Sequence, residues 1–150
     1  MKFLSKLAAT FFGIGYCPIA PGTAGTAAGV LLAFVLAPSP VWYVVVSVLL
    51  IVIGIASSSY LEKILGQKDP GIIVIDEVAG IMLSLACLPL TPTMMISGFF
   101  LFRAFDMFKI YPINKLEALP GGWGIVLDDL MAGLYTNIVL QIACRLAGNI

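Results

Sequence analysis

The chain has 150 residues, of which 61% are hydrophobic and only 11% are charged, whereas about a quarter of the residues in a soluble domain are charged. This composition predicts an integral membrane protein. The net charge is zero, so a polynucleotide would find no electrostatic attraction, and nucleic-acid binding is excluded. Histidine is absent, which excludes serine–histidine–aspartate hydrolysis and histidine-ligated zinc. Three widely separated cysteines predict neither a disulfide framework nor a metal site.

Five apolar runs follow a lysine-containing N-terminal segment that has no convincing signal-peptide cleavage site and is expected to stay in the mature chain. The runs cover residues 23–37, 41–60, 72–90, 93–109 and 123–147. A helix satisfies all of its backbone hydrogen bonds internally, as a segment in lipid must. The sequence therefore predicts an all-α integral membrane helical bundle of about five membrane helices, with an N-terminal interfacial segment. We expect one membrane-embedded domain over residues 1–150.

The distribution of lysines predicts the orientation of these helices. Lysines occur in the N-terminal segment and in the connections after the second and fourth runs, whereas the turns around Pro38 and Pro89 carry no charge. Positively charged residues concentrate on the cytoplasmic side of membrane proteins. We therefore expect the N-terminus and the lysine-bearing connections on the cytoplasmic face.

Seven charged residues stand in apolar or motif-like surroundings, where an unpaired charge costs on the order of several kcal/mol. They are Asp76, Glu77, Arg103, Asp106, Lys109, Asp128 and Asp129. Internal salt bridges are one explanation, but the five carboxylates outnumber the two cations. All five fall at the expected cytoplasmic ends of the last three runs. Clustered carboxylates repel one another, and Mg²⁺ is the natural ion to neutralise them.

Two short stretches repeat a spacing that would bring carboxylates together. IDEVAG (residues 75–80) and DDLMAG (residues 128–133) both have an acidic residue four positions before a glycine. Residues four apart share one face of a helix. A glycine one turn deeper lets two helices approach closely, so that their carboxylates reach a single ion. The alternative is that both glycines serve only helix packing.

The stretch FRAFDMFK, residues 102–109, has Arg103, Asp106 and Lys109 at every third position. These residues share one broad helical face. Two cations flanking a carboxylate suit a site that holds a phosphate beside a metal. The alternative is that the long cationic side chains extend from the helix end into water.

The stretch PIAPGTAGTAAG, residues 18–29, begins the first apolar run on the expected cytoplasmic side. Free backbone N–H groups at a helix N-terminus attract anions. Gly22 and Thr23 would offer backbone and hydroxyl donors there. An ordinary helix N-cap is the alternative, and the lysine of a P-loop is missing.

Together, four stretches resemble the phosphatidylglycerophosphatase A family. They are FGIGYCPIAPGTAGT (12–26), DPGIIVIDEVAG (69–80), FRAFDMFK (102–109) and PGGWGIVLDDLMAG (120–133). The resemblance implies an Mg²⁺-dependent membrane enzyme that converts phosphatidylglycerophosphate to phosphatidylglycerol and phosphate, in phospholipid synthesis. It implies the inner membrane of a bacterium, with the active site on the cytoplasmic face. Ile110, where the family usually has proline, and Ala24, where it often has tryptophan, depart from the pattern.

For this reaction we expect Asp76, Glu77, Asp128 and Asp129 to bind Mg²⁺. The expected phosphate-binding residues are Gly22, Thr23, Arg103 and Lys109. The expected catalytic residues are Asp76, Glu77, Asp106 and Asp129, with Asp106 either a further ligand or the base that orients water. A covalent aspartyl-phosphate route stays open. The alternative function is a small membrane cation transporter or channel, which would distribute its acids across the membrane depth. The sequence leaves the oligomeric state undetermined.

Overall fold

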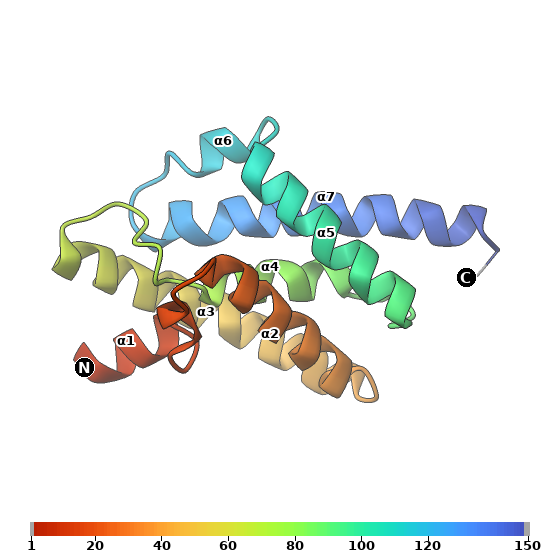
Figure 1. Ribbon diagram of the computed structural model, residues 1–150, viewed down its shortest axis with the longest axis horizontal. Coiled ribbons are helices and arrows are strands. Elements are labelled where there is room, and N and C mark those ends of the chain that lie inside the picture. The colour runs from red at the N-terminus through yellow and green to blue at the C-terminus, as the bar shows by residue number, and fades with distance from the viewer. Residues whose placement is uncertain (1, 149–150) are drawn as a thin grey trace.

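The computed structural model describes residues 2–148, and every regular element in this range is helical. The elements are α1 (Lys2–Ala9), the 3-10 helix η1 (Ile14–Tyr16), α2 (Pro21–Leu36), α3 (Pro40–Leu65), α4 (Ile75–Leu85), α5 (Pro92–Phe108), α6 (Ile113–Leu116) and α7 (Gly122–Leu146). The predicted all-α fold class is confirmed for these residues. Figure 1 shows the long helices running back and forth, with α1 and α6 at the end where α7 begins.

Helix α4 forms the centre of the bundle and contacts α2, α3, α5 and α7. Nine of its 11 residues are buried. A helix that is apolar on all sides belongs in the interior of a protein. The largest fully buried side chains include Ile81, Met82 and Leu85 of α4 and Phe102 of α5. The core therefore surrounds the helix that begins with Asp76 and Glu77 at its first turn.

Among residues 2–148, two helices are long and apolar enough to cross a membrane, α3 with 26 residues and α7 with 25. At 1.5 Å per residue each covers a hydrocarbon core of about 30 Å. Helices α2, α4 and α5 have 16, 11 and 17 residues, below the about 20 that a full span needs. The expected membrane protein is thus supported, and the part of the chain that the structure describes does not contain five full-length spans. Hydropathy does not detect helix ends, and the run over residues 72–90 leaves the helix after Leu85.

The C-terminus of α4 is capped by side chains from its neighbours. The Tyr43 hydroxyl donates a hydrogen bond to the Met82 carbonyl at 2.6 Å. The Asn137 amide donates to the carbonyls of Ser84 and Ala86 at 3.0 and 2.9 Å. The last carbonyls of a helix have no partner within it, and lipid offers none. These bonds allow α4 to end inside the bundle.

Gly80 of α4 and Gly133 of α7 face each other. A Cβ added to Gly133 would collide with the Gly80 carbonyl, and one added to Gly80 would collide with the Asp129 carbonyl and the Phe102 ring. The two helix backbones therefore approach as closely as the repeated acid–glycine spacing predicts. This contact brings the first turn of α4 beside Asp129.

Candidate active site

Four helix ends meet around one polar cavity of about 240 Å³. They are the N-terminal ends of α2, α4 and α7 and the C-terminal end of α5. All seven charged residues that the sequence singles out line this cavity, together with Gly22 and Asp69. The fold therefore brings residues from Gly22 to Asp129 into one site, because antiparallel helices return to the same end of the bundle.

Three carboxylates form a group that fits a metal ion. Asp76, Glu77 and Asp129 each offer an oxygen, and these oxygens lie within 4.8 Å of one another. One oxygen of each, namely Asp76 Oδ1, Glu77 Oε2 and Asp129 Oδ2, is buried without a hydrogen-bond partner among residues 2–148. A buried polar atom that lacks a partner is costly, and carboxylate oxygens are the ligands that Mg²⁺ prefers. The trio of Asp76, Glu77 and Asp129 therefore fits a divalent cation.

Asp128 lines the same cavity, but both of its oxygens already accept hydrogen bonds. Its Oδ2 accepts a hydrogen bond from the Lys109 ammonium at 2.9 Å, and its Oδ1 accepts one from the Asp129 backbone at 2.9 Å. Asp128 is not part of the trio that could hold a metal. Of the four expected ligands, the structure groups three around one point and pairs the fourth with a cation.

Lys109 lies at the C-cap of α5 with a left-handed φ of 45°. Its ammonium lies 2.9 Å from both Asp128 and Glu117. Partial burial acts to lower the pKa of Lys109, but the hydrogen bonds to Glu117 and Asp128 outweigh it and raise that pKa above its ordinary value. Lys109 is therefore a fixed positive charge. Spacing did not point to Glu117, because it lies in a polar loop whose folding back is a tertiary feature.

Arg103 bridges α5 and the carboxylate trio. Its Nη1 donates to Asp106 Oδ2 at 2.7 Å and lies 3.9 Å from Glu77 Oε1. A guanidinium has five N–H donors in a rigid fork, and both of these contacts use Nη1. Arg103 is therefore oriented by Asp106, and it lines the cavity with donors to spare for an anion.

Helix α2 begins at this cavity. Its N-cap is Ala20, with a left-handed φ of 52°, and within the described residues no side chain caps the helix. Gly22 lines the cavity, and a Cβ there would collide with the Glu77 carboxylate and crowd Arg103. The start of α2 at Gly22 thus lies beside Glu77 and Arg103. The first N–H groups of a helix have no partner within it, which suits an anion site. Thr23 is exposed and is not among the lining residues.

Asp69 also lines the cavity, although the helical spacing of the acids does not predict it. It lies in the loop between α3 and α4 with a left-handed φ of 47°. Desolvation by the cavity walls raises the pKa of Asp69, and Lys109 acts in the opposite direction. Asp69 has no helical spacing to the other acids, which is why periodicity misses it. Its position before Pro70 and Gly71 was the available signal.

A family model described as phosphatidylglycerophosphatase A matches residues 7–144. The chain belongs to the phosphatidylglycerophosphatase A family. It is 36% identical over 146 residues to phosphatidylglycerophosphatase A of Escherichia coli, covering 89% of this chain and 80% of that protein. The Haemophilus influenzae phosphatidylglycerophosphatase A is 35% identical over 138 residues, with coverages of 89% and 85%. A putative phosphatidylinositol-3-phosphatase of Bacteroides thetaiotaomicron is 35% identical over 151 residues, with coverages of 95% and 94%.

No solved structure matches the chain. Membership of the phosphatidylglycerophosphatase A family confirms the resemblance and makes the chain a phosphoric monoester hydrolase of phospholipid metabolism. All four stretches that carried the resemblance lie within the matched residues. The alternative of a cation transporter or channel is not supported.

Proposed function

We propose that this protein hydrolyses the terminal phosphate of phosphatidylglycerophosphate, with Mg²⁺ as its cofactor, and releases phosphatidylglycerol and phosphate. The observation that carries the proposal is the carboxylate trio, in which each residue has one buried oxygen without a partner among the described residues. This trio lies in one cavity with Arg103, Lys109 and the start of α2. A phosphomonoester dianion needs this combination of metal ligands, cations and amide donors around it.

Asp76, Glu77 and Asp129 are the residues that would hold the ion. Bound there, Mg²⁺ would supply positive charge and Lewis acidity to a phosphate oxygen. Asp128 has a different role in this proposal. Because both of its oxygens already accept hydrogen bonds, it anchors Lys109 beside the phosphate.

The remaining groups bind and orient the substrate. Arg103 and the backbone N–H of Gly22, at the start of α2, bind phosphate oxygens. Thr23 lies outside the cavity lining and is left out of the site. Asp106 holds Arg103 through Oδ2, and its other oxygen orients the attacking water. A direct attack by water and a covalent aspartyl-phosphate route both use this arrangement of charges.

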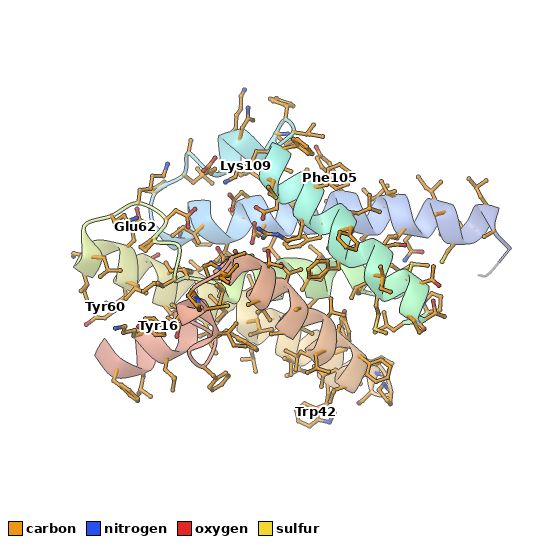
Figure 2. All side chains as sticks on the ribbon, viewed as in Figure 1. Tyr16, Trp42, Tyr60, Glu62, Phe105 and Lys109 are labelled. Atoms are coloured by element: carbon orange, nitrogen blue, oxygen red, sulfur yellow. The ribbon has the colours of Figure 1, made fainter. Side chains whose placement is uncertain are left out.

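We further propose that the protein is a multi-pass protein of the bacterial inner membrane, with this cavity on the cytoplasmic face. The lysines of the connecting loops lie at the same end of the bundle as the cavity. Aromatic residues are typical of membrane interfaces. Figure 2 shows Tyr16 and Tyr60 at the left of the molecule and Trp42 at its lower edge, and along α3 Trp42 lies in the first turn whereas Tyr60 lies near the C-terminal end. Tyr16 is 51% exposed and Trp42 is 61% exposed.

Phosphate release by the purified protein tests the proposed function. In detergent micelles with Mg²⁺ we expect release from phosphatidylglycerophosphate, and we expect EDTA to abolish it. Full activity in EDTA would contradict the metal mechanism. Phosphatidylinositol 3-phosphate is the second candidate substrate, because the Bacteroides relative carries the name of a phosphatase for it. If kcat/KM were higher for phosphatidylinositol 3-phosphate than for phosphatidylglycerophosphate, phosphatidylinositol 3-phosphate would be the preferred substrate.

A further inference from the structure

A second cavity lies between α2 and α5, and it is apolar. It has a volume of about 350 Å³ and is formed by Ala27 and Val30 of α2 and by Met95, Ile96, Phe99 and Phe100 of α5. Helices α2 and α5 contact each other and run side by side in Figure 1. None of these side chains carries a polar group, so the α2–α5 groove suits an aliphatic ligand.

The α2–α5 groove continues from the active site along both of its helices. Phe99 lies one helical turn before Arg103, so the two share a helix face and are about 6 Å apart along its axis. On α2, Ala27 lies five residues after the cavity-lining Gly22, about 7.5 Å further along the helix. Helix α2 begins at the active-site cavity and α5 ends there. The groove therefore begins about one turn below the proposed phosphate-binding groups.

The groove also extends away from the active site and is open along its side. It reaches Pro92, 11 residues before Arg103, which corresponds to about 16 Å of helix. Ile96 and Phe100 are 58% and 66% exposed, and Ala27 is exposed. The polar active-site cavity followed by the apolar groove matches a ligand that is polar at one end and aliphatic over about the next 16 Å.

We propose that the α2–α5 groove holds one acyl chain of the lipid substrate while the phosphate of the same molecule occupies the active site. The proposal rests on the proposed lipid phosphatase function. Surrounding lipid tails are as apolar as the groove, so burial alone favours the groove little. The chain is instead selected because it is tethered to a bound headgroup, which gives it a high effective concentration at the groove.

The variant Ala27→Phe tests this proposal, because a phenyl ring at this position fills the α2–α5 groove. The measurement is kcat/KM for dioleoyl phosphatidylglycerophosphate divided by kcat/KM for the water-soluble headgroup phosphate without acyl chains. We expect Ala27→Phe to lower this ratio about tenfold, the scale of discrimination in an apolar pocket. Ala143→Phe, the same change at an exposed alanine of α7, is the matched control and is expected to keep the wild-type ratio.

Photo-crosslinking of the wild-type protein gives a second readout that depends neither on turnover nor on a variant. A phosphatidic acid with a diazirine in the middle of one acyl chain is expected to label peptides of α2 and α5 at Ala27, Met95 or Phe99. Labelling spread evenly over α3 and α7, or a crosslink between two copies of the chain at the groove, would overturn the proposal. So would an unchanged ratio in an active Ala27→Phe protein. Absence of phosphate release from the wild type would reject the proposed function, and crosslinking would still decide the groove.

Discussion

At the residue scale, the charges of the cavity divide into two groups. Asp106 and Asp128 each accept a hydrogen bond from a cation, at 2.7 and 2.9 Å. Asp76, Glu77 and Asp129 keep buried oxygens that lack partners among the described residues. Surplus negative charge is therefore concentrated in the trio.

Asp76→Asn is expected to lower phosphate release by more than about 100-fold, since even indirect partners of a metal site are worth 10–100-fold. The measurement is activity as a function of Mg²⁺ concentration. In EDTA, the variant is expected to unfold at the same or a higher temperature than wild type, because one of several neighbouring negative charges is removed. Loss of activity with a lower unfolding temperature would indicate misfolding instead.

Asp128→Asn and Asp129→Asn are neighbouring changes of identical chemistry with different expected results. Asp129→Asn removes a proposed ligand, so the Mg²⁺ concentration for half-maximal activity should rise at least about tenfold. Asp128→Asn removes the charge that holds Lys109, so KM should rise about tenfold while the half-maximal Mg²⁺ concentration stays within about twofold. If both variants raised the half-maximal Mg²⁺ concentration equally, Asp128 would have to be a metal ligand as well.

At the element scale, the site depends on how closely α4 and α7 approach. The backbones meet at Gly80 and Gly133, where a Cβ would strike a carbonyl group. Backbone atoms cannot rotate away as a flexible side chain can, so a larger residue must move a whole helix. Asp76 and Asp129 lie one turn from these glycines, and separation of the helices would open the trio.

Gly133→Ala is therefore expected to lower the free energy of unfolding by about 1–3 kcal/mol, the usual cost of overpacking, and to weaken Mg²⁺ activation. Thermal unfolding in detergent measures the first effect. Gly54→Ala is the matched control in α3, where the nearest atom to an added Cβ is a Val126 methyl at 3.4 Å. That change should be neutral or slightly stabilising, because alanine favours a helix. A stable Gly133→Ala protein with wild-type activity would contradict this account of the contact.

At the scale of the whole molecule, the two ends of the bundle differ in charge, and each end has its own accessible cysteine. Cys17 follows η1 near the proposed cytoplasmic end, and Cys87 lies in the turn between α4 and α5 at the other end. Cys87 is exposed and Cys17 is partly exposed, and neither forms a disulfide. These native thiols report orientation without any added tag.

A membrane-impermeant maleimide added to intact spheroplasts is expected to label Cys87 and to label Cys17 only after the membrane is permeabilised. Mass spectrometry of the modified peptides distinguishes the two thiols, and Cys87→Ser is the control for the outer signal. Labelling of Cys17 alone on intact spheroplasts would reverse the proposed orientation.

Several features followed from the sequence because they depend on local composition and spacing. Mean hydropathy indicated membrane helices, and the acid–glycine spacing in residues 75–80 and 128–133 indicated the close approach of two helices. The surplus of carboxylates over cations indicated a site for a divalent cation. The family followed from motif order. Each of these properties is present in a short stretch of chain or in a simple count of charges.

Only the tertiary structure decided which charges are partners. The pairing of Asp128 with Lys109, the grouping of Asp76, Glu77 and Asp129, and the position of Asp69 in the cavity wall depend on distances between residues far apart in the chain. Helix ends inside the bundle, such as that of α4 at Leu85, depend on capping by neighbouring helices. The α2–α5 groove exists because side chains of two separate helices leave space between them. Spacing within one helix sets which residues share a face, but packing between helices sets what that face meets.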